Sequence, residues 1–237
     1  MGKAVMEAVD SRNDCTIVAG VDLMTEFSLG YPIYSEISAV KETADVVIDF
    51  SHPSLLDKIL DYCKTSNTAA ILCTTGYSDA QTSQIQRAAA DLPLFYSRNM
   101  SLGVNLLIEL AKKAQAVLGD AFDVEIIEMH HNQKIDAPSG TALMIADAIN
   151  EVQDHALKYE YDRHSKRQKR EKNEIGIHAV RGGTIVGEHQ VVFAGNHETL
   201  TLSHSAQSKE LFASGAVKAA LFMKDKKQGL YDMSDII

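Results

Sequence analysis

The sequence predicts an α/β protein, with a Rossmann-like domain built on a parallel sheet and a second α+β domain whose sheet is open and mixed or antiparallel. Two observations indicate this. In the first hundred residues, short apolar strands alternate with amphipathic helices, which is typical of a parallel, doubly wound sheet. In the second half, strand-like segments follow one another through short glycine-containing turns, and such turns join antiparallel neighbours.

The first half of the chain shows the alternation directly. Helices are expected at residues 2–9, 53–65 and 79–90, and strands at 16–21, 45–50, 69–73 and 94–96. Sheets of this class bind ligands at the carboxyl ends of their strands. We therefore expect a ligand near Asp22, near Cys73 to Thr75 and near Ser97 to Met100, which lie at such ends.

Asp22 carries a weak dinucleotide signal. It follows Gly2 by twenty residues, the spacing at which a dinucleotide fold places a carboxylate on the adenosine ribose. The alternative is a plain turn former, because aspartate is common after a strand. A carboxylate here would repel a 2′-phosphate, and Leu23 rather than an arginine follows it. The position therefore favours NADH over NADPH.

The second half predicts a sheet backed by helices. Strands are expected from residue 124 and at 175–180, 184–193 and 199–204, with helices at 100–118, 141–152 and 208–224. The strongly charged stretch 158–173 is expected to be a solvated loop, with a basic RNA-binding patch as the less favoured alternative. An open sheet face of this kind invites burial against another subunit.

The stretch 125–142 holds the candidate chemistry. Ser139 is a good N-cap for the helix that follows, and the backbone N–H groups of Gly140 and Thr141 would face an anion such as a carboxylate. Lys134 adds a positive charge and a transferable proton, and His130 at a strand end exchanges protons near neutral pH. This combination suits a small acidic substrate that is protonated during reaction.

Two alternatives compete for the same residues. Adjacent histidines with a lysine in a loop are commonly only solvated. A zinc site is less favoured still, because His130 and His131 are neighbours whose side chains face opposite ways along a strand. No cysteine pair or H-E-x-x-H pattern accompanies them.

Composition narrows the class of protein. The net charge of −9 argues against nucleic acid as a general partner. No apolar run is long enough to span a membrane, and no signal peptide is visible. Cys15, Cys63 and Cys73 form neither a C-x-x-C motif nor an even framework, so they are interpreted as reduced thiols. We expect a cytoplasmic protein that binds neither nucleic acid nor membrane.

One motif is specific to a family. It spans residues 128–142 and has the form E-x-H-H-x-x-K-x-D-x-P-S-G-T-A. It closely resembles the signature of the bacterial dihydrodipicolinate reductases, also called 4-hydroxy-tetrahydrodipicolinate reductases. The resemblance extends over nearly the whole chain and includes N-x-S-x-G-x-N at 99–105, R-x-G at 181–183 and G-E-H at 187–189.

The resemblance implies an activity and its residues. The implied reaction is NAD(P)H-dependent reduction of 4-hydroxy-tetrahydrodipicolinate to tetrahydrodipicolinate, with loss of water, in the diaminopimelate and lysine pathway. The implied catalytic residues are His130 and Lys134, and those that hold the small dicarboxylate substrate are His131, Gly140 and Thr141. A homotetramer formed through the second sheet is also implied. For Arg181 a substrate contact and a structural role in the turn both stay open.

The resemblance also implies the cofactor site and the domain boundaries. The cofactor-binding residues would be Met1, Gly2, Asp22, Cys73, Thr74, Thr75, Ser97, Arg98, Asn99 and Met100. Met100 and Cys73 stand where the family more often has Phe and Gly. Residues 1–100 and 206–237 would form the dinucleotide-binding domain, and residues 101–205 the substrate-binding and oligomerisation domain.

The start of the chain carries a separate expectation. Met1 and Gly2 match the last two residues of the family's G-x-x-G-x-M-G loop. We therefore expect the natural protein to begin upstream with a first strand.

Two other classes of protein remain as alternatives. A semialdehyde-type dehydrogenase would need a cysteine nucleophile, and none of the three cysteines lies in a convincing elbow. A non-catalytic nucleotide-binding protein is made plausible by the missing part of the glycine-rich loop, and the presence of both His130 and Lys134 weighs against it.

Overall fold

The computed structural model describes residues 1–26 and 29–237 and divides the chain into two compact units. Unit 1 comprises Met1–Ser101 and Glu210–Ile237, and unit 2 comprises Leu102–Lys209. Unit 2 thus begins one residue later than the expected 101 and ends at 209 rather than 205. Each unit is described by itself.

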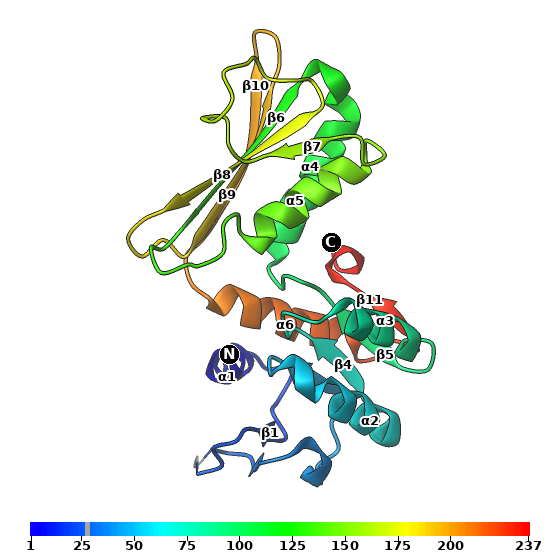
Figure 1. Cartoon of the computed structure of the whole chain (residues 1–237). Coiled ribbons are helices and arrows are strands. Elements are labelled where there is room, and N and C mark those ends of the chain that lie inside the picture. Colours follow the sequence, from blue (N-terminus) through cyan, green and yellow to red (C-terminus); the bar gives the residue numbers. More distant parts are fainter. Residues whose placement is uncertain (27–28) are drawn as a thin grey trace. The chain divides into compact units, whose positions relative to one another are not determined.

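Unit 1 is built on a parallel four-stranded sheet, as the sequence predicted (Figure 1). Its strand order is β11-β5-β4-β3, and every neighbouring pair is parallel. The strands are β3 Val46–Asp49, β4 Ala69–Leu72, β5 Pro93–Tyr96 and β11 Gly229–Tyr231. Strand β4 is buried along its whole length, which explains its continuous apolar run.

Helices cover both faces of this sheet. They are α2 Leu56–Ser66, α3 Asp79–Ala88 and α6 Glu210–Met223, and a further helix, α1 Gly2–Asp10, packs on α6. Helices α2 and α3 share one apolar core with Ala70 and Leu72 of β4. Ile71 points the opposite way, because side chains alternate along a strand. Helix α6 contacts β3, β4 and β5 as well as α1, so it covers this second face (Figure 1).

The prediction of a strand at 16–21 is wrong for most of its length. Only Gly20–Val21 forms a strand, β1, which pairs in parallel with β2, Ile33–Tyr34, in a separate two-stranded sheet. A strand needs backbone hydrogen bonds to a neighbouring strand, and β2 pairs with these two residues alone. Gly20 also lacks the Cβ that would meet the Ile33 side chain at 2.6 Å.

Unit 2 holds a mixed five-stranded sheet with order β10-β9-β6-β8-β7. The strands are β6 Asp123–His130, β7 Lys158–Glu160, β8 Glu174–Arg181, β9 Gly187–Ala194 and β10 Thr199–Ala206. Strands β6, β8 and β7 run parallel, whereas β9 is antiparallel to both β6 and β10. Helices α4, Leu102–Leu118, and α5, Gly140–Glu151, pack with the inner face of this sheet in one core.

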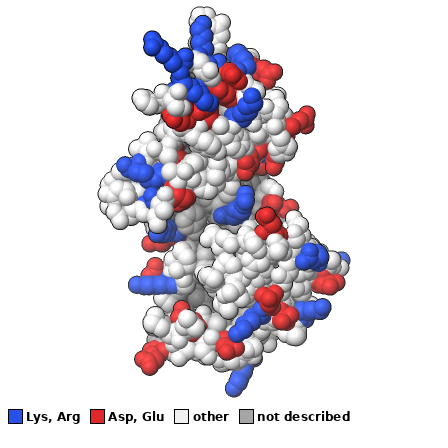
Figure 2. Space-filling model, in the orientation of Figure 1, with Lys and Arg blue, Asp and Glu red and all other residues white. Residues whose placement is uncertain are grey.

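The charged stretch 158–173 departs from the prediction only at its start. Residues 158–160 form strand β7, whereas residues 161–173 form a mostly exposed loop without helix or strand, as expected. Ion pairs join this loop to neighbouring strands. Arg170 lies 3.0 Å from both Asp123 and Glu125 of β6, and Arg163 lies 2.8 Å from Glu174 of β8. Basic and acidic side chains are accordingly interspersed at the upper end of the view in Figure 2.

Within the described residues, the structure contains no helix of the length and apolar character needed to cross a bilayer.

Candidate active site

His130 occupies the last position of β6 and lies on its buried face. Its Nδ1 is 2.6 Å from Oε2 of Glu128, a residue that points the same way because it precedes His130 by two positions on the strand. The ring also packs edge-on against His189, with centroids 5.3 Å apart. The sequence therefore places this histidine among polar groups inside unit 2, away from bulk solvent.

Glu128 is fully buried and is the centre of this cluster. Its carboxylate accepts from His130, from the Ser139 N–H at 3.0 Å, and from both terminal nitrogens of Arg181 at 2.7 and 2.8 Å. A carboxylate offers about four acceptor sites, so its capacity is filled. Burial alone would raise its pKa, but these hydrogen bonds outweigh burial and hold the pKa of Glu128 below its ordinary value.

The sequence left open whether Arg181 contacts a substrate or has a structural role, and its hydrogen bonds bear on this choice. Its Nη1 donates to Glu128 and to the Val180 carbonyl, and its Nη2 donates to Glu128 and to the Asp136 carbonyl. All four terminal hydrogens of the guanidinium thus have acceptors within the protein. The structure favours the structural role of Arg181 over a contact with a substrate carboxylate.

His189 links the cluster to helix α5. Its Nε2 lies 2.9 Å from the Ser139 hydroxyl, which also accepts the Ala142 N–H. Burial is the largest of the effects that together lower the pKa of His189 to about 4, and the nearby positive charges act in the same direction while Glu128 opposes them. His189 is accordingly a neutral ring in the folded protein.

Lys134 and His131 lie on the loop after β6. The Lys134 N–H donates to the His131 carbonyl at 3.2 Å, and Nζ lies 2.8 Å from Asp136. The loop is tied to the turn after β8, because Gly182 N–H donates to the His130 carbonyl at 2.9 Å. Asp136, the partner of Lys134, also gives its backbone carbonyl to Arg181, so the loop that carries Lys134 is joined to the buried cluster. His131 is half-buried on the same loop.

Gly140 and Thr141 form the first turn of α5, as expected. Ser139 caps this helix with extended backbone, and its hydroxyl accepts the Ala142 N–H at 3.2 Å. A Cβ on Gly140 would meet nothing within 4 Å, and no acidic residue stands in the first turn. The start of α5 therefore combines open space with the positive end of a helix dipole.

The cofactor residues expected in unit 1 lie at the start of α1 and at strand ends. Helix α1 begins at Gly2 without a side-chain cap from Met1, and space is open around Gly2. Asp22 is exposed after β1, and its Oδ1 accepts the Met24 N–H at 2.9 Å. An uncapped helix start and an exposed carboxylate are groups that suit a dinucleotide's phosphate and ribose.

The residues after β4 form a hydrogen-bonded turn. Thr74 donates to the buried Asp49 carboxylate at 2.8 Å, and the Cys73 N–H donates to the Asp49 carbonyl at 2.9 Å. Thr75 is exposed beside them. Burial raises the pKa of Cys73 well above its ordinary value and that of Cys63 to about 12. Neither thiol is therefore an activated nucleophile, which disfavours the semialdehyde-type alternative.

The residues after β5 form the other predicted contact. Ser97 donates to the Asn99 carbonyl at 2.9 Å, and the Asn99 side chain accepts the Ser101 N–H at 2.9 Å. Met100 is buried and Arg98 is exposed. The hydroxyl, amide and guanidinium groups gathered here suit a polar cofactor.

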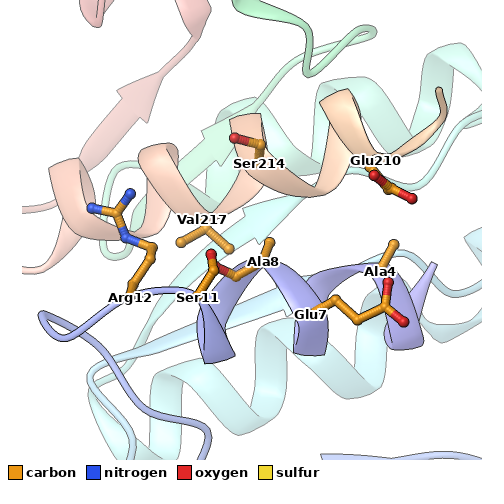
Figure 3. Close-up of a pocket in the computed structure, with 8 residues that line it drawn as sticks. All are labelled: Ala4, Glu7, Ala8, Ser11, Arg12, Glu210, Ser214 and Val217. Atoms are coloured by element: carbon orange, nitrogen blue, oxygen red, sulfur yellow. The ribbon is translucent and has the colours of Figure 1, made fainter. Parts of the chain in front are cut away.

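A cavity of about 270 Å³ lies between α1 and α6 in unit 1 (Figure 3). Its lining consists of Ala4, Glu7, Ala8, Ser11, Arg12, Glu210, Ser214 and Val217. Glu7 and Glu210 lie toward one end and Arg12 toward the other, where it pairs with Asp14 (Figure 3). None of the site residues predicted from the sequence lines this cavity.

Among residues 1–26 and 29–237, no group of three or more His, Cys, Asp or Glu side chains is arranged to hold a metal ion.

The parallel sheet of unit 1 has the Rossmann-type arrangement that is common among nucleotide-binding proteins. Family models described as dihydrodipicolinate reductase N-terminus and C-terminus match residues 1–100 and 103–237. The chain belongs to the dihydrodipicolinate reductase family, which confirms the resemblance seen in the sequence.

Individual relatives agree with this assignment. The chain is 51% identical to a 4-hydroxy-tetrahydrodipicolinate reductase of Caldanaerobacter subterraneus, over 100% of this chain and 94% of the relative. It is 48% identical to one of Clostridium novyi with the same coverage. A solved structure of dipicolinate-bound dihydrodipicolinate reductase from Paenisporosarcina sp. matches with a TM-score of 0.83 and 27% identity, covering 100% of this chain and 95% of that one.

Proposed function

We propose that this protein reduces 4-hydroxy-tetrahydrodipicolinate to tetrahydrodipicolinate with NAD(P)H in the diaminopimelate and lysine pathway. The observation that carries the proposal is the buried His130–Glu128 pair, with Lys134 on the adjoining loop and the open start of α5 in the same unit. Relatives that cover the whole chain bear the name of this reductase.

The substrate is proposed to be a small cyclic dicarboxylate. Its carboxylates would be held by His131 and by the backbone N–H groups of Gly140 and Thr141, where the helix dipole favours negative charge. A solved relative of similar fold is described as dipicolinate-bound, and dipicolinate is a ring that carries two carboxylates. Gly140 supports this role because a substrate could approach its backbone without meeting a side chain.

Proton transfer is assigned to Lys134 and His130. Lys134 donates a proton to the substrate, and its partner Asp136 keeps the ammonium on the loop at 2.8 Å. His130 donates or accepts a proton beside it. A bound nicotinamide supplies the hydride.

The cofactor is proposed to bind in unit 1. Met1 and Gly2 would hold phosphate at the start of α1, and Asp22 would hold the ribose. The strand-end groups from Cys73 to Thr75 and from Ser97 to Met100 would hold the remainder. Asp22 favours NADH over NADPH, since its exposed carboxylate would repel a 2′-phosphate.

Assembly and location complete the proposal. The outer face of the unit 2 sheet carries half-buried apolar side chains, including Ile127, Met129 and Val192. We propose that this face is buried in a homotetramer, and a cytoplasmic location remains the expectation from the sequence.

The direct test is NADH oxidation. The purified protein is mixed with freshly made product of the preceding synthase, and absorbance at the reduced-nicotinamide band is followed. Substrate-dependent oxidation is the expected result, with parallel runs in NADH and NADPH to measure the preference. No oxidation with either nucleotide, from protein that is folded by circular dichroism, would contradict the proposal.

A further inference from the structure

Glu128 joins three parts of unit 2 at one buried carboxylate. Oε2 accepts hydrogen bonds from Nδ1 of His130 and one nitrogen of Arg181. Oε1 accepts them from the Ser139 N–H and the other nitrogen of Arg181. Strand β6, strand β8 and the start of helix α5 therefore meet at this side chain. A carboxylate held by so many donors cannot turn away from His130 without breaking the others.

The contact with Glu128 decides which ring nitrogen of His130 carries the proton. An ionised carboxylate only accepts hydrogen bonds, so at 2.6 Å the Nδ1 of His130 must be the donor. In the neutral ring Nε2 is then the unprotonated nitrogen. Charge assistance makes a bond of this length strong, so the alternative tautomer is disfavoured.

Gly187 lies beside the other nitrogen of the His130 ring. It opens β9 on the buried face, and a Cβ added there would lie 3.0 Å from Nε2 and 3.4 Å from Cδ2 of His130. A side chain at this position would press on the one nitrogen that Glu128 leaves available. This gives a physical role to the glycine of the G-E-H motif at 187–189.

Arg181 holds Glu128 in turn. Its bidentate contact fixes the plane of the carboxylate, and the Asp136 carbonyl anchors the guanidinium to the loop that carries Lys134. His189 packs against His130 in an edge-type contact and is a neutral ring. The groups in contact with His130 thus include one anion and a neutral histidine, and the arginine that holds the anion also contacts the loop of Lys134.

We propose that Glu128 is a positioning residue of this enzyme, which fixes the Nδ1–H tautomer of His130 so that Nε2 is the nitrogen that exchanges a proton with the substrate. The inference rests on the proposed function for the identity of the reaction. It assigns Glu128 no contact with substrate, and it makes Arg181 the residue that orients Glu128.

The first test reads the tautomer without substrate. Histidine side chains labelled with ¹⁵N are observed by NMR at alkaline pH, where the ring is neutral. Nδ1 of His130 is expected to carry the proton, and the Nε2–H tautomer in the unaltered protein would overturn the proposal. In Glu128→Gln the single amide oxygen is drawn to the Ser139 N–H and to Arg181. The NH₂ group then faces Nδ1, and the tautomer is expected to switch to Nε2–H.

Kinetics on the same variant give the second readout. Glu128→Gln is expected to lower kcat by about a hundredfold or more, the scale of a lost general acid or base, with the dissociation constant for NADH unchanged. The matched control is Glu174→Gln, because Glu174 is also a buried carboxylate paired with an arginine, Arg163 at 2.8 Å. The control is expected to leave both the tautomer and kcat unchanged.

A double variant separates positioning from charge balance. If Glu128 served only to neutralise Arg181, then Glu128→Gln combined with Arg181→Met would restore kcat. We expect no recovery, and restoration to within a fewfold of the starting rate would overturn the proposal.

The two proposals fail in different ways. If Glu128→Gln retained full kcat, the positioning role of Glu128 would be contradicted and the reductase assignment would be unaffected. A tautomer switch in a protein that oxidises no NADH would instead contradict the assignment and leave the positioning of His130 supported.

Discussion

His189 shows how one buried side chain couples this protein to pH. Its pKa is lowered to about 4 from an ordinary 6.5, chiefly by burial. Between these values the unfolded chain binds a proton that the folded protein excludes, so unfolding is favoured as pH falls. Stability contributed by His189 is therefore complete above about pH 6.5 and is lost progressively down to about pH 4.

We predict that the free energy of unfolding falls by about 3 kcal/mol across this window because of His189. Urea titrations at intervals from pH 7 to pH 4 measure the slope. His189→Gln keeps an acceptor for the Ser139 hydroxyl but cannot titrate, so its slope is expected to be shallower. His164→Gln removes an exposed histidine and serves as the control. Equal slopes for both variants would contradict the prediction.

Lys134 carries the second prediction at this scale. Lys134→Ala removes the proposed proton donor and its ion pair with Asp136, and we expect turnover to fall by about 10²-fold to 10⁴-fold. The affinity for NADH is expected to stay nearly intact, since the cofactor is assigned to unit 1. Lys113→Ala, on the exposed side of α4, is the control. A Lys134→Ala enzyme that reduced substrate at the original rate would show that the donor is another group.

Glu128 and Arg181 mark the limit of what the sequence could say about the site. The motif at 128–142 identified His130, Lys134 and the start of α5, because these residues are close in sequence. The partner of Glu128 lies 53 residues away on a neighbouring strand, and a pairing at that distance depends on strand register. One local signal was available: a carboxylate two residues before a histidine on a strand shares its face.

Helix α6 depends on the absence of one side chain. A Cβ on Gly215 would lie 1.7 Å from the Met100 carbonyl oxygen, so the helix and the segment after β5 approach more closely than any other residue allows. The obstacle is backbone, which cannot rotate away as a side chain can. Gly215 therefore permits the close approach of α6 to the segment after β5.

We predict that Gly215→Ala destabilises the protein by about 3 kcal/mol or more, at the upper end of the range for overpacking. Gly176→Ala is the comparison, because its Cβ would meet only the end of the Glu125 side chain, at 1.8 Å. That carboxylate can move, so the loss is expected to be smaller. Chemical denaturation of both variants measures the difference, and the reverse order would refute this account of α6.

The elements themselves were predictable where local patterning was strong. The helix at 2–9 and the strands of the parallel sheet were confirmed within a few residues, because each carries its own apolar period. Strand β11 was missed, since Gly229–Tyr231 is short and is a strand only through its pairing with β5. In the stretch 158–173 the exposed loop was predicted, whereas strand β7 and the ion pairs of the loop were not, because these depend on neighbouring strands.

At the scale of the whole molecule, the outer face of the unit 2 sheet is where subunits are proposed to meet. Val192 lies on this face of β9 and is half-buried in the single chain. Burying a charge at a subunit contact without a partner costs several kcal/mol. We therefore predict that Val192→Glu converts the assembly to smaller species, as measured by sedimentation velocity.

The control places the same change elsewhere on unit 2. Val117 is 71% exposed on α4, so Val117→Glu is expected to leave the sedimentation coefficient unchanged. If Val192→Glu retained the full assembly, the proposed contact face would be wrong.

The discontinuity of unit 1 has a consequence for synthesis on the ribosome. Unit 2 is one uninterrupted segment, Leu102–Lys209, whereas unit 1 needs α6 and β11, which leave the exit tunnel after unit 2. A nascent chain can therefore complete the histidine cluster while strands β3 to β5 still lack the helix that covers one of their faces. Until α6 has been synthesised, the growing polypeptide exposes that apolar face. A holdase chaperone would bind it during this period.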